Sequence, residues 1–162
     1  MKITLLAQHP AALPVLARWY YDAWGREAGI SLDDELAKLT KALHATLPLV
    51  LLALDGDEVI ACVQVKEREM PQFPELAHWL GGVYVAAHCR GKGVASRLID
   101  EAVALAAGMG ISNLHLQTEE LSGGLYRQLG WEPLFPALNH GIHVLVMARA
   151  LAQPACHDAA AA

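Results

Sequence analysis

Residues 83–98, VYVAAHCRGKGVASRL, decide how this chain folds. A short run rich in valine is followed by a small polar loop, then by Arg-Gly-Lys-Gly, then by an amphipathic segment. This pattern predicts a strand, a tight turn and a helix. Gly91 and Gly93 lack the Cβ atoms that would keep an anion away from the backbone, and the first N–H groups of a helix have no intrahelical partner. The turn is therefore predicted to bind a phosphate.

The charges around this turn support the phosphate interpretation. Arg90, Lys92 and Arg97 cluster there, and no acidic residue occurs between Ala86 and Ile99, although the chain carries a net charge of −5. The alternative is a plain strand-to-helix turn, with glycines for tightness and a lysine for solubility. The basic cluster favours phosphate over that alternative.

Two common phosphate-binding motifs do not fit the turn. Residues 91–96 are a near miss to the dinucleotide fingerprint G-x-G-x-x-G, with Glu119 or Glu120 at a plausible distance for a ribose contact. However, Ser96 replaces the third glycine, no alternating β-α units precede the motif, and too little chain follows it. A P-loop is excluded because its glycine and lysine pattern does not occur.

A third pattern fits better. Arg-Gly-Lys-Gly-Val-Ala, residues 90–95, resembles the Gln/Arg-x-x-Gly-x-Gly/Ala signature of the GNAT superfamily of N-acetyltransferases. LYRQLGW, residues 125–131, resembles the second motif of that family, a tyrosine followed by glycine and an aromatic residue. The order of the predicted elements also matches, so the resemblance extends from residue 2 to about residue 151.

In the rest of the chain, the periodicity of apolar residues predicts the strands and helices, and turn residues indicate where they end. Strands are predicted at 2–7, 49–55, 58–66, 78–85, 113–118, 131–138 and 140–151, and helices at 10–24, 31–44, 94–106 and 121–129. Ser31 is predicted to cap the second helix, and Asp55-Gly56-Asp57 to turn a hairpin. Leu121, Leu125 and Leu129 are predicted to form the apolar stripe of the last helix.

The fold class that follows is mixed α/β (α+β). The resemblance implies a GNAT-like fold, with a central mixed, largely antiparallel sheet of about seven strands, about four helices, and splayed fourth and fifth strands. It implies that acetyl-CoA enters between those two strands. The implied acetyl-CoA-binding residues are Val83 and Val85, whose backbones hold the pantetheine arm, and Arg90, Gly91, Lys92, Gly93, Val94, Ala95 and Ser96, which wrap the pyrophosphate.

The resemblance also implies a division of catalytic work. Tyr126 matches the general acid of the family, and a phenol with a pKa of about 10 is a reasonable proton donor to a departing thiolate. The backbone N–H of Val83 is predicted to polarise the thioester carbonyl, at a bulge that Gly81-Gly82 makes possible. The asparagine that the family often places before the tyrosine is absent here, where residues 123–124 are glycines.

The general base and the acceptor site are less determined. Many members of the family carry a glutamate on the fourth strand, and this strand has none. The alternatives are His78, which we carry as the candidate base, solvent, and the glutamates Glu75, Glu119 and Glu120. Trp19 and Trp24 are predicted to contact a cationic amine, because aromatic faces suit cations. The alternative is a core role for the segment WYYDAW, 19–24, since helical spacing places Tyr20 and Trp24 on one apolar face.

Composition limits the other possibilities. The 162 residues are 54% hydrophobic, which predicts one domain, residues 1–151, followed by a disordered tail, 152–162. The longest apolar run, 47–54, is too short for a bilayer and the N-terminus does not resemble a signal peptide, so a cytoplasmic protein without membrane contact is expected. The acidic charge disfavours nucleic acid, and the three scattered cysteines indicate no disulfide framework and no metal site.

The sequence therefore predicts an enzyme: an acetyl-CoA-dependent N-acetyltransferase, acting by direct attack in a ternary complex. The acceptor is predicted to be a primary amine of a small molecule or of a peptide N-terminus. The alternative is a non-catalytic module that binds acetyl-CoA or CoA as a sensor or scaffold. The identity of the amine and the oligomeric state, a homodimer included, are left open by the sequence.

Overall fold

Seven strands form one sheet in the computed structural model, which describes residues 1–44 and 46–153. The strands are β1 (Lys2–Leu5), β2 (Leu49–Asp55), β3 (Glu58–Glu67), β4 (His78–Val85), β5 (Asn113–Thr118), β6 (Glu132–Asn139) and β7 (Ile142–Ala150). The α-helices are α1 (Leu13–Tyr20), α2 (Leu32–Thr40), α3 (Val94–Gly108) and α4 (Gly124–Gln128). Short 3₁₀ turns lie at Leu6–Gln8, Pro10–Ala12, Lys41–Leu43 and Ala87–Cys89, and a π-helical turn, η3, at Tyr21–Gly25.

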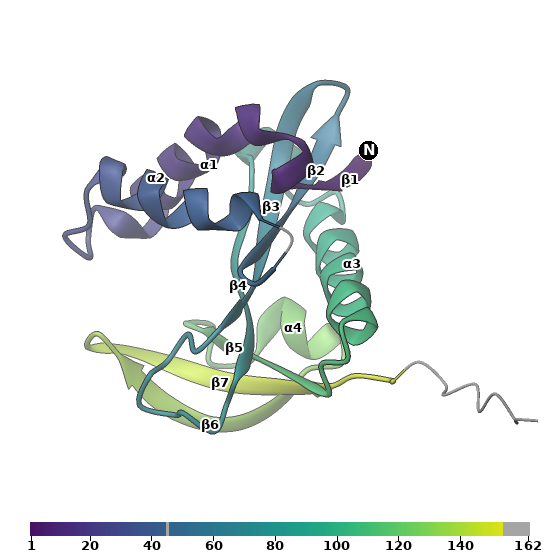
Figure 1. Ribbon diagram of the computed structural model, residues 1–162. Helices are drawn as coiled ribbons and strands as arrows, with labels where there is room; N and C mark the ends of the chain where they lie inside the picture. The colour runs from purple at the N-terminus through teal and green to yellow at the C-terminus, as the bar shows by residue number, and fades with distance from the viewer. Residues whose placement is uncertain (45, 154–162) are drawn as a thin grey trace, which may run out of the picture.

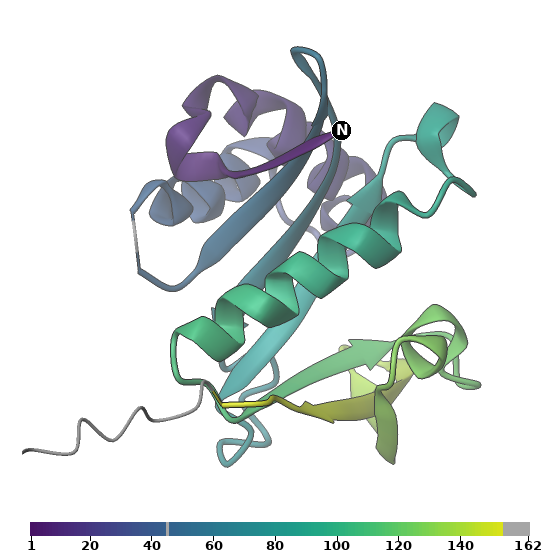
Figure 2. The ribbon, with the colours of Figure 1, turned by 90° about the vertical axis from the view of Figure 1, so that its right-hand side faces the viewer.

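The strand order is β1-β2-β3-β4-β5-β7-β6, and only the β4–β5 pair is parallel. Helix α3 provides the crossover between these two strands, and α1 and α2 lie on the opposite face of the sheet (Figures 1 and 2). The prediction of a mixed, largely antiparallel sheet of seven strands with four helices is confirmed. The prediction of one domain over residues 1–151 stays a prediction.

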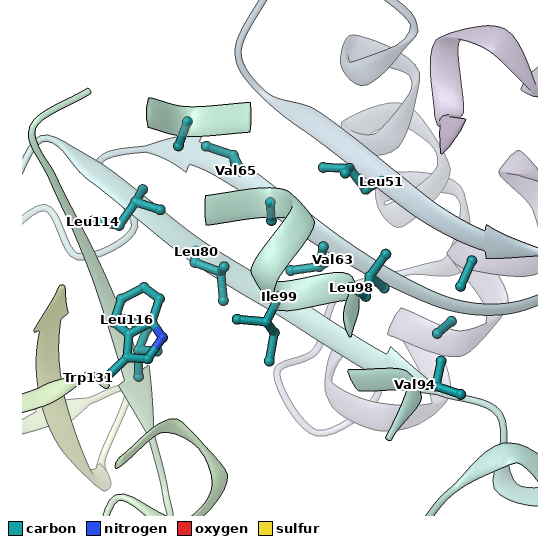
Figure 3. Packing of buried hydrophobic residues seen from close by; sticks show 14 of the residues in the cluster. Leu51, Val63, Val65, Leu80, Val94, Leu98, Ile99, Leu114, Leu116 and Trp131 are labelled. Carbon is teal, nitrogen blue, oxygen red and sulfur yellow. The ribbon is translucent and has the colours of Figure 1, made fainter. Parts of the chain in front are cut away.

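Helix α3 holds the sheet through a continuous apolar face. Val94, Leu98, Ile99, Ala102 and Ala106 are buried against β2, β3 and β4, with Leu80 and Val63 among their neighbours (Figure 3). Their spacing of three and four residues places them on one side of the helix. Burying one such leucine or isoleucine contributes roughly 1.5–3 kcal/mol. The packing fixes where the first turn of α3 lies relative to β4.

The strands β4 and β5 separate soon after they meet. Trp79 and His115 are their one registered pair in the described part of the chain, and the strands then diverge (Figure 2). The splayed fourth and fifth strands are therefore confirmed. Trp79 is fully buried at this junction, and its ring lies 5.7 Å from that of His115. This contact closes one end of the opening, and the other end faces the loop after β4.

Several elements differ from the prediction. The first strand ends at Leu5 because the chain turns into a 3₁₀ helix. Helix α4 begins only at Gly124, so Leu121 lies outside it and is 56% exposed. The prolines of residues 131–138 do not break β6, because it is an edge strand, where a missing N–H is tolerated.

Other local predictions are confirmed. The Ser31 hydroxyl accepts a hydrogen bond from the Asp34 N–H, and the Asp34 carboxylate in turn accepts one from the Ser31 N–H, which makes a capping box at the start of α2. The predicted tail falls almost entirely on residues 154–162, which lie outside the described residues. Among the residues that are described, no helix is long and apolar enough to cross a membrane.

Candidate active site

The loop after β4 presents backbone to solvent at its two glycines. Gly91 and Gly93 have φ values of +72° and +75°, which L-residues with side chains rarely adopt. A Cβ built at either position meets no atom within 4 Å, so the space in front of the backbone is open. Gly93 is also the N-cap of α3 and supplies no side-chain cap to the first turn. The open backbone and the uncapped helix end fit a bound phosphate.

The basic residues at the loop divide into two groups. Lys92 and Arg97 are exposed beside the glycines. Arg90 instead turns back over β4: its Nε donates to the Val85 carbonyl at 2.9 Å, and its guanidinium lies 5.7 Å from the centre of the Tyr84 ring. The predicted cluster is therefore only partly assembled, since Arg90 fixes the end of β4 and already occupies the carbonyl of Val85.

A bulge interrupts β4 at the predicted glycines. Cys62 pairs with Tyr84 and Gln64 pairs with Gly81, so two residues of β4, Gly82 and Val83, oppose Val63 alone. Gly82 has φ +57°, which relieves the extra residue in the strand. The expectation of a bulge at Gly81-Gly82 is confirmed, whereas the role of the Val83 N–H toward a thioester stays a prediction.

Tyr126 lies on α4, the short helix that follows β5. This helix lies beside β5, at the opening between β4 and β5 (Figure 2). Its ring packs against Trp131 at a centroid distance of 6.4 Å in an edge-to-face contact. It packs on the same core cluster as Leu125 and Leu129. Burial raises the pKa of the Tyr126 hydroxyl, so this group retains its proton at neutral pH.

A polar cluster covers the α1 and α2 side of the sheet near Gly81. Lys66 of β3 forms an ion pair with Glu69, and Gln117 Nε2 of β5 donates to Glu69 Oε1 at 3.0 Å. A Cβ at Gly81 would lie 3.7 Å from Glu69 Oε2. A glutamate reaches about that far from its own Cβ, by ordinary bond lengths. Glu69 thus places a carboxylate within the reach that a glutamate at position 81 would have, with the Lys66 side chain between it and the backbone.

The sequence did not indicate Glu69, because the residue lies in the loop between β3 and β4 rather than on β4. The one available signal was the missing glutamate of β4. It indicates that another residue must act as the general base, but not which residue. The amide of Gln117 is oriented by its bond to Glu69, and its oxygen is buried without a hydrogen-bond partner among the described residues. An unpaired buried acceptor next to a carboxylate suits a ligand that donates N–H bonds.

The predicted bases lie elsewhere. His78 begins β4, three residues before Gly81, and its Nε2 lies 3.9 Å from Glu67 Oε1. Glu119 and Glu120 follow β5, and Glu120 is engaged by Ser122, whose hydroxyl and N–H hold the pKa of that carboxyl below its usual value. The structure does not bring these groups to the bulge, so the base role of His78 stays a prediction.

The two tryptophans occupy different environments. Trp19 stacks on Tyr84 at a centroid distance of 4.8 Å and lines a surface hollow beside Val59 and His88. Trp24 is 44% exposed, although the helical spacing placed it on the buried face with Tyr20. The chain passes into the π-helical turn η3 after Tyr20, which changes the direction of the later side chains. Both tryptophans are on the α1 side, and their contact with an amine stays a prediction.

A sheet that opens between parallel strands, with an uncapped helix end at the opening, is suited to bind a ligand that carries phosphate groups. Residues 13–131 match the family model described as the Acetyltransferase (GNAT) family. The chain belongs to this family, as its two motifs indicated, and acetyl transfer is the activity of the family. No curated protein matches the chain.

Solved structures share the whole architecture. An aminoglycoside 6'-N-acetyltransferase complexed with coenzyme A is 15% identical, with a TM-score of 0.74 over 96% of this chain and 100% of that one. A ribosomal-protein-alanine N-acetyltransferase from Brucella melitensis is 23% identical, with a TM-score of 0.74 over 93% and 100%. A Salmonella typhimurium protein with its cofactor acetyl-CoA is 18% identical, with a TM-score of 0.73 over 98% of both chains. At these identities the likeness concerns the fold.

Proposed function

We propose that the protein is an acetyl-CoA-dependent N-acetyltransferase that acetylates a primary amine of a small molecule or of a peptide N-terminus. The observation that carries the proposal is the opening between β4 and β5, which ends at the uncapped N-terminus of α3 with Gly91 and Gly93 open in front of it. The similar solved structures support the choice of carrier, because one contains coenzyme A and another acetyl-CoA. Two are named for amine acceptors of the two classes, an aminoglycoside and an alanine of a ribosomal protein.

The residues of the loop would hold the diphosphate of the carrier. The N–H groups of Val94, Ala95 and Ser96 belong to the first turn of α3 and point out of the helix, and Lys92 adds positive charge. The backbones of Val83 and Val85, on the half of β4 that has left β5, would hold the pantetheine arm. The Val85 carbonyl already accepts a hydrogen bond from the Arg90 side chain. Arg90 would therefore have to move before that carbonyl could bind the pantetheine arm.

The reaction needs three proton movements. The acceptor ammonium loses one proton and becomes a nucleophilic amine, which attacks the thioester carbon and forms the C–N bond. The attacking nitrogen then loses a second proton, and the C–S bond breaks as the thiolate takes a proton from Tyr126. One proton is released overall, and the Tyr126 phenolate is reprotonated from solvent. The hydroxyl of Tyr126 retains its proton until it is needed because burial raises its pKa.

Glu69 is the group that we assign to the acceptor side. Its carboxylate lies next to Gly81, one residue before the bulge, and it already binds an ammonium, that of Lys66. A primary ammonium from the acceptor can replace Lys66 there, with the free oxygen of Gln117 as a second acceptor. Glu69 would hold the ammonium and receive its proton, directly or through water.

The test is thiol release from acetyl-CoA across a panel of aminoglycosides, polyamines and short peptides, with the acetylated product identified by mass spectrometry. Thiol release with an amine supports the enzyme. Calorimetric binding of acetyl-CoA without release on any amine would support the alternative, a non-catalytic acetyl-CoA-binding module.

Glu69→Gln distinguishes the acceptor side from the rest of the site. We expect kcat/KM for the amine to fall at neutral pH by about tenfold or more, within the range of general base catalysis, and to recover as alkaline pH deprotonates the amine. Glu67→Gln, on the neighbouring strand residue, should leave kcat/KM unchanged. An equal loss in both variants, or no recovery at high pH, would contradict the assignment of Glu69.

A further inference from the structure

Tyr20 reaches the bulge of β4 from the end of α1. It is 4% exposed, and its hydroxyl donates a hydrogen bond to the Gly82 carbonyl at 2.8 Å. The two residues are 62 positions apart in the sequence. The Cys62 thiol, on β3, donates to the Tyr20 oxygen at 3.3 Å; it also lies 3.8 Å from the Gly82 oxygen, where a thiol is a much weaker donor than the Tyr20 hydroxyl at 2.8 Å. A chain of two hydrogen bonds therefore runs from β3 through the Tyr20 hydroxyl to the bulged peptide.

The direction of these bonds is fixed by chemistry. A carbonyl oxygen only accepts, so the proton of the Tyr20 hydroxyl must point at Gly82, and its oxygen is left to accept from Cys62. Burial raises the pKa of Tyr20 well above its ordinary value and raises the pKa of Cys62 to about 12. Both groups keep their protons over the pH range of an enzyme assay, so deprotonation does not remove the bond to the bulge.

The bulged peptide needs such a bond to hold its orientation. Glycine adopts either sign of φ at little cost, so the backbone at Gly81 and Gly82 does not by itself determine which way the Gly82–Val83 peptide faces. The surroundings also leave room for little else, since a Cβ at Gly82 would lie 2.7 Å from the Tyr20 hydroxyl oxygen. The hydroxyl fills the space of the absent side chain and binds the peptide at the same time.

A peptide plane transmits this constraint from one residue to the next. In a trans peptide the C=O and the following N–H lie on opposite edges of one rigid plane. When Tyr20 holds the Gly82 oxygen toward α1, the Val83 N–H must point away from α1. We propose that Tyr20 is a positioning residue, which aims the Val83 N–H at the thioester oxygen by holding the other edge of the same peptide. The proposal rests on the proposed function, because it assigns Tyr20 to the acetyl-transfer site.

The chain offers a matched pair of variants. Tyr20→Phe removes the hydroxyl and keeps the ring in the core. Tyr21→Phe removes a hydroxyl one residue later, from a ring that Arg18 and Arg26 contact by its face, a contact that phenylalanine preserves. Losing one oxyanion donor typically lowers kcat by about 10²–10³-fold. Since Tyr20 acts only through the peptide, we expect kcat to fall by roughly 10- to 100-fold, with KM for acetyl-CoA within about twofold.

A second measurement separates positioning from packing. In a ¹⁵N–¹H spectrum, acetyl-CoA should shift the Val83 amide proton of the wild type more than CoA does, because only acetyl-CoA brings the carbonyl. That difference should be lost in Tyr20→Phe and kept in Tyr21→Phe, while the rest of each spectrum reports an intact fold. A purely structural role would not change it.

The outcomes keep the two proposals apart. An active wild type with Tyr20→Phe at full kcat, or with the Val83 shift retained in Tyr20→Phe, overturns the role of Tyr20 and leaves the proposed function standing. A wild type that binds acetyl-CoA but acetylates no amine fails as an enzyme. In that case the Val83 shift still decides whether Tyr20 orients the peptide, since it requires binding only.

Discussion

The two edges of β4 behave differently. Toward β3, pairing runs from Glu67 and His78 to Ala61 and Val85, interrupted by the bulge. Toward β5, the register contains the single pair Trp79 and His115. Because buried backbone groups need hydrogen-bond partners, the half of β4 that leaves β5 offers its N–H and C=O groups to something that pairs as a strand would. One edge of the strand thus belongs to the core, and under the proposed function the other edge would pair with the acetyl-CoA.

The burial of the side chains also differs between β3, at the closed edge, and the second half of β4, at the open edge. Val63 and Val65 of β3 are fully buried under α3, so the closed edge is held by packing as well as by strand pairing. Val83 and Val85 of β4 are only partly buried, and Tyr84 between them contacts Trp19 and Arg90 near the surface. The closed edge is expected to determine stability, and the open edge to determine affinity and rate. The following variants test this division, beginning with the largest expected effect.

Tyr126→Phe should affect the rate alone. The ring and its contact with Trp131 are kept, while the proton for the leaving thiolate is lost. General acid catalysis is typically worth about 10²–10⁴-fold, so kcat should fall by about that factor, with KM for acetyl-CoA nearly unchanged. Because the pKa of Tyr126 is raised, kcat of the wild type should show no alkaline loss from this group below pH of about 10. Full activity of the variant at all pH values would make Tyr126 a packing residue.

Gly93→Ala and Gly110→Ala should separate affinity from stability. Both glycines have positive φ, +75° and +82°, with open space around a Cβ, and they flank the two ends of α3. Each alanine should destabilise the fold by roughly 1–2 kcal/mol. Only Gly93→Ala should weaken acetyl-CoA binding, by about tenfold or more, because the added Cβ would hold the phosphate away from the backbone N–H groups and weaken a charge-assisted hydrogen bond. Equal affinities by calorimetry would remove the phosphate interpretation of the loop.

His115 tests the junction where the two edges part. Burial, as the main cause, lowers the pKa of His115, whose Nδ1 lies 3.3 Å from the His78 carbonyl oxygen. The unfolded chain therefore binds the proton more readily, and stability should be complete above pH of about 6.5 and fall as the pH drops below it. His115→Asn should flatten this dependence in denaturant titrations. His143→Asn, at an exposed position of β7, should not, and an unchanged slope in His115→Asn would exclude His115 as its source.

Lys92→Gln should have the smallest effect. An exposed lysine near a phosphate acts mainly through its charge, so the loss of acetyl-CoA affinity should be a few-fold at low salt. It should shrink as ionic strength rises toward about 0.15 M, where the Debye length is about 8 Å. Lys41→Gln, on the far side of the sheet near α2, is the control. A loss that does not change with salt would indicate a structural role for Lys92.

The sequence predicted those features that local chemistry determines. Strand 78–85 and the start of α3 were placed correctly, because a valine-rich run, two glycines and a helical repeat follow one another without interruption. The bulge was also predictable, since two adjacent glycines weaken a strand unless the backbone bulges or bends there. The family motifs then gave the opening between the fourth and fifth strands, which no local pattern shows.

The rest depends on contacts between distant segments. Nothing near Glu69 in the sequence says that its carboxylate ends beside Gly81, because the loop between β3 and β4 must fold first. The bond from Tyr20 to Gly82 was equally hidden, since the aromatic spacing shows only that Tyr20 is buried. Trp24 was misplaced because helical periodicity does not reveal a π-helical turn.

The prolines of β6 have a consequence for the protein at high concentration. This strand closes the sheet, and two of its exposed side chains are leucines, Leu134 and Leu138. Such an edge would normally recruit the strand of another molecule. Pro133 and Pro136 remove two amide donors, and a bulge between Pro133 and Phe135 twists the backbone there. We therefore expect the prolines and the bulge to hinder intermolecular sheet growth along this apolar rim.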